Sequence, residues 1–250
     1  MVGRRERTRS DGSDLGAGLD TGGVNRSFAL VALAAVALVV GAVVLVTGGR
    51  DRSAPAAEAP PTLATPAAGE LRTISRATGI PRRALTAYVE AAERVRQEDS
   101  QCRIGWNTIA GIGSSESSHG AFGGATIGDD GVVEPKIIGV ALDGTGGNRA
   151  IEDTDGGRLD GDTTWDRAVG PMQFIPTTWE VWGADANGDG VADPHHIGDA
   201  ALAAARYLCD AGDHDLTGSE QWSAAVLTYN ASGSYARKVA QTATEYADAI

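Results

Sequence analysis

Residues 106–120 read WNTIAGIGSSESSHG and carry the clearest structural signal in this chain. Their apolar residues recur at the spacing of one helix face: Trp106, Ile109, Ala110 and Ile112. We therefore predict a helix over 106–117, with Gly120 as a residue suited to the turn that ends it. Glu116 is the only charged residue of this helix and lies near its C-terminal end.

Further helical patterns flank this segment. Residues 81–97 begin with proline, which is tolerated in the first turn of a helix, and repeat apolar residues at helical spacing. Three more helices are predicted on the C-terminal side, over 199–209, 217–229 and 234–249. Asp199 is a natural N-cap for the first of them, and Thr217 with Glu220 forms a capping-box pattern for the second.

Between residues 120 and 166 the chain is rich in Gly and Asp. Its β-branched pieces are short: Ile137, Ile138 and Val140. We interpret this part as an irregular insertion that could hold a β-hairpin. The fold class is therefore mostly α with an α+β character, in a single domain over 70–250.

A membrane anchor is predicted over residues 28–47, which are 20 consecutive residues without a charge. A helix of that length spans about 30 Å, the thickness of the hydrocarbon core of a bilayer. Arginines are more numerous before the run than close after it, so residues 1–27 are expected to stay cytoplasmic and the rest to cross. A cleaved signal peptide, and hence secretion, is the alternative, although its apolar region is usually about 7–15 residues long.

Residues 48–69 are rich in Ala and Pro. Such a composition favours extended backbone and cannot bury a core, so it predicts a semi-rigid linker. Charge also changes here, because residues 1–69 carry 7 basic and 6 acidic groups whereas 70–250 carry 14 and 27. The net charge of −12 argues against a protein that binds nucleic acid by neutralising phosphates.

The two cysteines, Cys102 and Cys209, both follow the predicted membrane span. An extracytoplasmic compartment permits disulfides, so we predict a bridge between them, with two free thiols as the alternative. In the chain-entropy model, closing a loop of more than a hundred residues contributes about 4–5 kcal/mol to the stability of the fold.

Several kinds of catalytic site are excluded by the sequence. It has no nucleophile elbow, no phosphate-binding glycine loop and no zinc-binding HExxH helix. The chemistry that remains centres on Glu116 and on two other segments. Residues 170–176 read GPMQFIP, a rigid apolar turn with one amide, and residues 228–232 read TYNAS at the end of a predicted helix.

In this order the three segments resemble the lytic murein transglycosylases of the lysozyme-like superfamily. The signature of that family is a Glu-Ser pair at a helix end, a Gly-x-Met-Gln-x-x-Pro turn and a Tyr-Asn motif. The stretch 168–208 is most similar to the membrane-bound B-type branch, and the whole resemblance covers about 79–246. One departure is Ala231-Ser232, where many relatives have Ala-Gly, and we expect it to change the turn geometry.

The resemblance implies a lysozyme-like fold and an enzyme, a carbon–oxygen lyase that acts on polysaccharide. Glu116 would be the single acid/base that cleaves the bond between N-acetylmuramic acid and N-acetylglucosamine and forms 1,6-anhydro ends. A raised pKa would suit it to this task, and an apolar pocket would raise that pKa by desolvation. The implied substrate-binding residues are Ser117, Met172, Gln173, Phe174, Tyr229 and Asn230.

The implied partner is the glycan of peptidoglycan, outside the cytoplasmic membrane, and proteins of cell-wall synthesis or division are further candidates. Two alternatives remain open: a muramidase that hydrolyses the same bond with water, and a non-catalytic wall-binding domain of the same fold. Of the five tryptophans in the domain, we expect most in the core and Trp165 to face the groove.

A calcium loop is also predicted. Residues 185–193 match the first nine positions of an EF-hand loop, with five ligands: Asp185, Asn187, Asp189, the Val191 carbonyl and Asp193. The twelfth position, normally a glutamate, is His196, so either the affinity for calcium is low or Asp199 substitutes for the glutamate. A metal-free loop of Asx turns is the alternative. No cofactor is expected for the chemistry itself, so calcium would be structural.

Overall fold

The computed structural model describes residues 57–250. The predicted cytoplasmic tail, the anchor over 28–47 and the first part of the linker lie outside the described residues. Within 57–250, no helix is both long and apolar enough to cross a bilayer.

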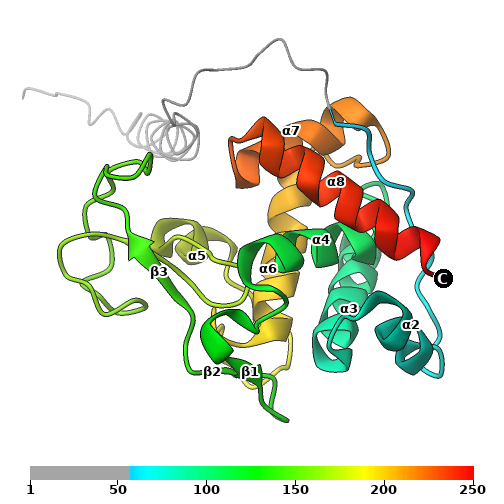
Figure 1. Cartoon of the computed structure of the whole chain (residues 1–250), viewed down its shortest axis with the longest axis horizontal. Coiled ribbons are helices and arrows are strands. Elements are labelled where there is room, and N and C mark those ends of the chain that lie inside the picture. The colour runs from blue at the N-terminus through cyan, green and yellow to red at the C-terminus, as the bar shows by residue number, and fades with distance from the viewer. Residues whose placement is uncertain (1–56) are drawn as a thin grey trace, which may run out of the picture. The chain divides into compact units, whose positions relative to one another are not determined.

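This part of the chain is mostly helical, with two small sheets, which is consistent with a lysozyme-like α+β fold. Its seven α-helices are shown in Figure 1: α2 (Leu71–Thr78), α3 (Arg82–Glu98), α4 (Trp106–Ser117), α5 (Pro176–Trp182), α6 (Ile197–Ala211), α7 (Ser219–Tyr229) and α8 (Gly233–Asp248). Five of them correspond to predicted helices, whereas the short helices α2 and α5 were not predicted.

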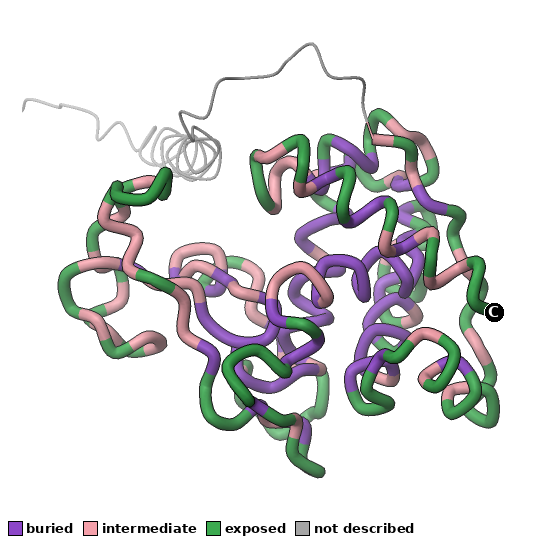
Figure 2. The backbone as a smooth tube through the Cα atoms, in the orientation of Figure 1, coloured by how far each residue is buried: buried purple, intermediate pink, exposed green. Residues whose placement is uncertain are grey.

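Helix α4 lies at the centre of the core and contacts α3, α6 and α8. Figure 2 shows most of α4, up to Gly113, as buried. Two glycines permit the close packing. A Cβ atom at Gly113 would lie 2.2 Å from the Tyr88 hydroxyl of α3, and one at Gly111 would lie 3.0 Å from the Val239 carbonyl of α8. Because helices surround α4, its C-terminal end is held in a fixed position.

Two predicted helix starts are wrong. Helix α6 begins at Ile197 and its N-cap is His196, whose Nδ1 lies 3.2 Å from the backbone N–H of Asp199. Asp199 is therefore inside the first turn. Helix α7 has Gly218 as its N-cap and no side-chain cap, because the Thr217 hydroxyl donates to Asp215 instead of capping the helix. The helix starts therefore differ from the predicted ones because His196 caps α6 in place of Asp199, and because Thr217 bonds a residue that precedes α7.

The insertion is irregular, as predicted. Strands β1 (Thr126–Ile127) and β2 (Val133–Glu134) form one antiparallel pair. Strands β3 (Ile138–Ala141) and β4 (Arg167–Val169) form another. The long connection between β3 and β4 is held by aspartates that accept hydrogen bonds from backbone N–H groups: Asp153, Asp155, Asp160, Asp162 and Asp166.

Residues 57–69, which composition assigns to the linker, lie against the domain. The N–H of Ala59 donates to Ser219 Oγ at 3.0 Å, and Ser223 Oγ donates to the Ala57 carbonyl at 2.8 Å. Further along, Asn107 Nδ2 donates to the Pro61 carbonyl at 2.9 Å. This strap of residues 57–69 is thus part of the ordered surface, because side chains of α4 and α7 bond its backbone groups.

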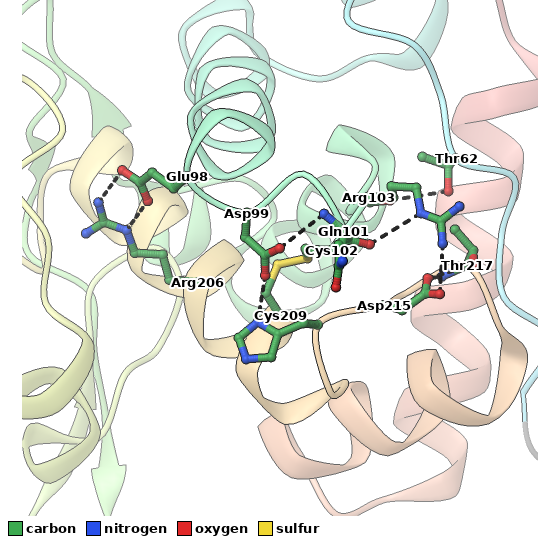
Figure 3. Close-up of a disulfide and its surroundings, with 11 residues drawn as sticks. Thr62, Glu98, Asp99, Gln101, Cys102, Arg103, Arg206, Cys209, Asp215 and Thr217 are labelled. Atoms are coloured by element: carbon green, nitrogen blue, oxygen red, sulfur yellow. Dashed lines mark hydrogen bonds and ion pairs between the residues drawn. A yellow bond between two sulfur atoms is a disulfide. The ribbon is translucent and has the colours of Figure 1, made fainter.

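Cys102 and Cys209 form the predicted disulfide, with their Cα atoms 5.5 Å apart. The bridge joins the turn after α3 to the last turns of α6 (Figure 3). Beside it, Arg206 of α6 pairs with Glu98 of α3 at 2.7 Å, so these two helices are linked twice.

Candidate active site

Glu116 lies in the last turn of α4 and is partly buried. Burial raises its pKa to about 7, because removing water disfavours the charged carboxylate. A hydrogen bond from Tyr235 and the charge of Lys238 act in the opposite direction and limit the rise. The carboxyl group is therefore partly protonated near neutral pH, as a general acid requires.

Tyr235, in the first turn of α8, donates a hydrogen bond to Glu116 Oε1. Burial raises the pKa of Tyr235 well above its ordinary value, so its hydroxyl is a neutral donor. Tyr235 was not predicted as a site residue, because its partner is 119 positions away in the sequence. The signal present was an aromatic residue six positions after Tyr229, at the start of a predicted helix.

The predicted GPMQFIP turn faces the end of α4. The backbone N–H and carbonyl groups of Val169 and Phe174 bond each other and close the turn. At its tip Gln173 has a left-handed backbone with a φ of +50°, and its Nε2 donates to the Gly170 carbonyl at 2.9 Å. Gly170 must be glycine, because its φ is +77° and a Cβ atom would lie 1.8 Å from the Pro194 carbonyl.

Ser117 connects the end of α4 to this turn. Its side chain is buried, its Oγ donates to the Pro171 carbonyl at 2.6 Å, and it accepts from the Gly120 N–H at 2.7 Å. These two bonds tie the end of α4 to the turn. The contact of Ser117 with a substrate stays a prediction.

Tyr229 connects the third motif to the same turn. Its hydroxyl donates to the Met172 carbonyl at 2.7 Å, and its ring packs edge-on against Phe174 with centroids 5.8 Å apart. Met172 and Phe174 are buried in the main apolar core of the domain. Asn230 is exposed and its Oδ1 accepts from the Ser232 N–H at 3.2 Å. Of the predicted binding residues, Gln173, Tyr229 and Asn230 keep accessible surface.

A buried polar network stands behind Glu116. His119 Nδ1 lies 3.2 Å from the Tyr88 hydroxyl of α3, and its Nε2 lies 2.9 Å from the Tyr246 hydroxyl of α8. Burial lowers the pKa of His119 to about 4, so the imidazole is neutral at ordinary pH, with one donor and one acceptor nitrogen. His119 lies three residues after Glu116, just beyond the end of α4, and its backbone is left-handed with a φ of +61°.

The predicted calcium ligands lie on one exposed loop. Asp185 Oδ1 and Oδ2 accept from the N–H groups of Gly188 and Gly190, at 2.7 and 2.8 Å. Buried Asp199 accepts from the N–H groups of Ala186 and Asp193 and so closes the loop. Across residues 57–250, no three His, Cys, Asp or Glu side chains are grouped as a metal site. Calcium binding is thus unsupported and stays a prediction.

Three of the five tryptophans are in the core, as predicted: Trp106, Trp179 and Trp222. Trp182 is partly exposed and packs on Tyr207 of α6, with ring centroids 5.6 Å apart. Trp165 is also partly exposed, within the insertion. Trp165 thus keeps surface that a sugar could contact, and this contact stays a prediction.

Comparison with known proteins adds one finding. Residues 150–226 match the family model described as the transglycosylase SLT domain. The match includes the GPMQFIP turn and α6, whereas Glu116 precedes it and Tyr229 follows it. No curated protein and no solved structure matched the chain. A transglycosylase of this family needs no cofactor. The matched region supports a lytic transglycosylase family for this chain.

Proposed function

We propose that this protein is a lytic transglycosylase that cleaves the β-1,4 bond between N-acetylmuramic acid and N-acetylglucosamine in peptidoglycan. The observation that carries the proposal is the environment of Glu116, whose carboxyl group has a pKa of about 7 beside Tyr235 and the GPMQFIP turn. Within the described residues, no second carboxylate influences that pKa. A single carboxyl group suits chemistry in which the substrate supplies its own nucleophile.

In the first step, protonated Glu116 donates its proton to the glycosidic oxygen. The bond between C1 of the muramic acid and that oxygen breaks, and the N-acetylglucosamine leaves with a free 4-hydroxyl. The oxygen of the 2-acetamido group attacks C1 and forms a cyclic oxazolinium ion. In the second step, the Glu116 carboxylate takes the proton of the 6-hydroxyl while O6 attacks C1 and expels the acetamido oxygen. The product has a 1,6-anhydro ring, and Glu116 is protonated again.

The surrounding residues support these steps in different ways. Tyr235 holds the carboxyl group in place through its hydrogen bond. Met172 and Phe174 are buried in the turn that Ser117, the neighbour of Glu116, bonds, and we infer that they contribute to the desolvation that raises the pKa of Glu116. Gln173 and Asn230 have the accessible amide groups that would bind the hydroxyl and acetamido groups of the sugars.

The test is the activity of Glu116→Gln on purified peptidoglycan, with products identified by mass spectrometry. Loss of the acid/base should lower the rate about 10²- to 10⁴-fold, because general acid–base catalysis contributes that much. The exposed Glu220→Gln on α7 is the control and should keep full activity. Wild-type products with reducing ends would establish the muramidase instead, and binding without any product would establish the wall-binding domain.

The location of the enzyme is part of the proposal. Residues 28–47 would anchor it in the membrane, with residues 1–27 in the cytoplasm and the catalytic domain outside. The disulfide between Cys102 and Cys209 supports an oxidising compartment for the domain. Protease added to intact spheroplasts should degrade the domain but spare a membrane-bound N-terminal fragment. Recovery of the domain in the medium would show that the segment is cleaved.

A further inference from the structure

A block of positive charge precedes the catalytic motifs in the sequence. Residues 71–89 contain four arginines and no acidic residue, although 70–250 carry 14 basic and 27 acidic groups. The four are exposed on α2 and the first turn of α3: Arg72, Arg76, Arg82 and Arg83. Other arginines of the domain, such as Arg94 and Arg206, pair with carboxylates. Within 57–250, none of these four does.

Two of these arginines line one hollow of about 480 Å³. We name it the arginine hollow; its lining is Ala68, Gly69, Leu71, Arg72, Thr73, Arg82 and Thr86. In the part of the chain that the structure describes, neither threonine hydroxyl has a hydrogen-bond partner. Glu70, the acidic residue nearest in sequence, accepts from the Ala67 N–H at 2.8 Å. The free groups of the hollow are thus two guanidinium groups and two hydroxyls.

The N-terminus of α3 lies at the same place. This helix has 17 residues, its N-cap is Pro81, and neither a side-chain cap nor an acidic residue occupies its first turn. The first N–H groups of a helix lack partners within the helix and carry a partial positive charge. These N–H groups therefore add to the positive electrostatic potential that Arg72 and Arg82 produce at the arginine hollow.

We propose that the arginine hollow binds a phosphate group. The guanidinium forks, the hydroxyls and the helix N-terminus together offer more donors than the two oxygens of a carboxylate can accept. A tetrahedral phosphate has enough oxygens to use them, and arginine matches its geometry with paired N–H donors. None of the lining residues belongs to the site around Glu116. The phosphate could come from a phosphodiester polymer of the wall or from a lipid headgroup, which share this chemistry.

The test uses the full chain in a non-ionic detergent, titrated with inorganic phosphate at constant ionic strength and followed by thermal unfolding. We expect a saturable rise in the melting temperature that sodium chloride does not produce. Arg72→Gln with Arg82→Gln should weaken phosphate binding about tenfold or more, because both forks are lost. Arg72→Lys with Arg82→Lys should weaken it less, because the charge remains.

The matched control is Arg94→Gln with Arg96→Gln, which removes the same charge from exposed positions of α3. It should bind phosphate like the wild type. Equal effects of phosphate and chloride, or equal loss in the control, would overturn the proposal. Among supporting results, competition by a soluble glycerol-phosphate polymer identifies a wall polymer, and competition by phosphatidylglycerol micelles identifies a lipid. Glycan cleavage should be unchanged in the double variant, which separates this proposal from the catalytic one.

Discussion

Two regions of the domain are stabilised in different ways. The helical frame, which consists of α3, α4 and α6–α8, buries a continuous set of apolar side chains. The insertion over 120–168 buries a much smaller apolar cluster, made of Ala125, Val133 and Ile137. Its turns depend instead on aspartate side chains that accept bonds from backbone N–H groups, such as Asp153 with the N–H groups of Asp155, Gly156 and Gly157.

The difference matters for the site because each region supplies one side of it. Glu116, Tyr229 and Tyr235 come from the frame, where packing from several helices fixes each side chain. Gln173 lies beside the insertion, since a Cβ atom at Gly139 of β3 would lie 3.0 Å from its Oε1. The carboxyl group of Glu116 therefore has a rigid support. The part of the site beside the insertion is held mainly by hydrogen bonds.

The largest expected effect on stability concerns the frame. Replacing both Cys102 and Cys209 by Ala should lower the free energy of unfolding by about 4–5 kcal/mol, because the unfolded chain regains the freedom of a long loop. Urea unfolding of the variant and of wild type measures this. Wild type treated with a reductant is the control and should show the same loss. A change below about 1 kcal/mol would mean that packing of α3 on α6 holds these segments without the bridge.

Removing one aspartate of the insertion should lower the free energy of unfolding less than removing the disulfide does, and its effect should stay within the insertion. Asp166 is fully buried, and its carboxylate accepts from the N–H and the hydroxyl of Thr154, at 2.9 and 2.8 Å. Asp166→Ala removes these bonds, which should cost about 1 kcal/mol, because exposed Thr154 can bond water instead. Hydrogen exchange should show the lost protection in 142–168 only. Asp143→Ala, at a solvated turn, should change less, and a global loss of protection would contradict the division into two regions.

The same division explains what the sequence could predict. The helices over 82–98 and 106–117 follow from local apolar spacing, so their predicted ends are within one residue of the observed ones. The start of α6 was missed, because His196 caps it while also bonding the Asp130 carbonyl at 3.0 Å. That bond depends on a loop 66 positions away, which no local pattern contains.

Those site residues that belong to sequence motifs could be predicted from the sequence. Glu116, Gln173 and Tyr229 stand in recognisable motifs, and the structure brings all three motifs together. Two features depended on tertiary packing and were not predicted. Tyr235 reaches Glu116 only because α8 packs on α4, and Ser117 is buried only because the GPMQFIP turn covers it.

An effect of intermediate size is expected at His119, where the frame meets the site. His119→Leu would leave the buried hydroxyl of Tyr88 and the half-buried hydroxyl of Tyr246 without this partner and would loosen the end of α4. A small displacement of Glu116 should lower the turnover rate about tenfold, because catalysis depends on precise geometry. His119→Gln, which keeps a donor and an acceptor, should recover part of the rate. If both variants lose stability but keep the wild-type turnover, His119 supports only the fold.

The smallest expected effect is a change in pH dependence at Glu116. In wild type the rate should fall as the pH rises above about 7, because the first step needs the protonated carboxyl group. The bond from Tyr235 stabilises the charged form and lowers the pKa, so Tyr235→Phe should raise the pKa and move the falling limb to higher pH. Lys238→Gln should move it in the same direction, because the positive charge of Lys238 also lowers the pKa.

Initial rates on soluble glycan fragments, measured from pH 5 to 9, give the position of this limb. Ser234→Ala, at an exposed position next to Tyr235, is the control and should keep the wild-type profile. A limb that moves to lower pH in Tyr235→Phe would mean that the tyrosine stabilises the neutral carboxyl group, contrary to the hydrogen bond described. A limb that stays in place in both variants would assign the falling rate to another group. A shift of the falling limb to higher pH in both variants would show that Tyr235 and Lys238 of α8, which belongs to the helical frame, lower the pKa of Glu116.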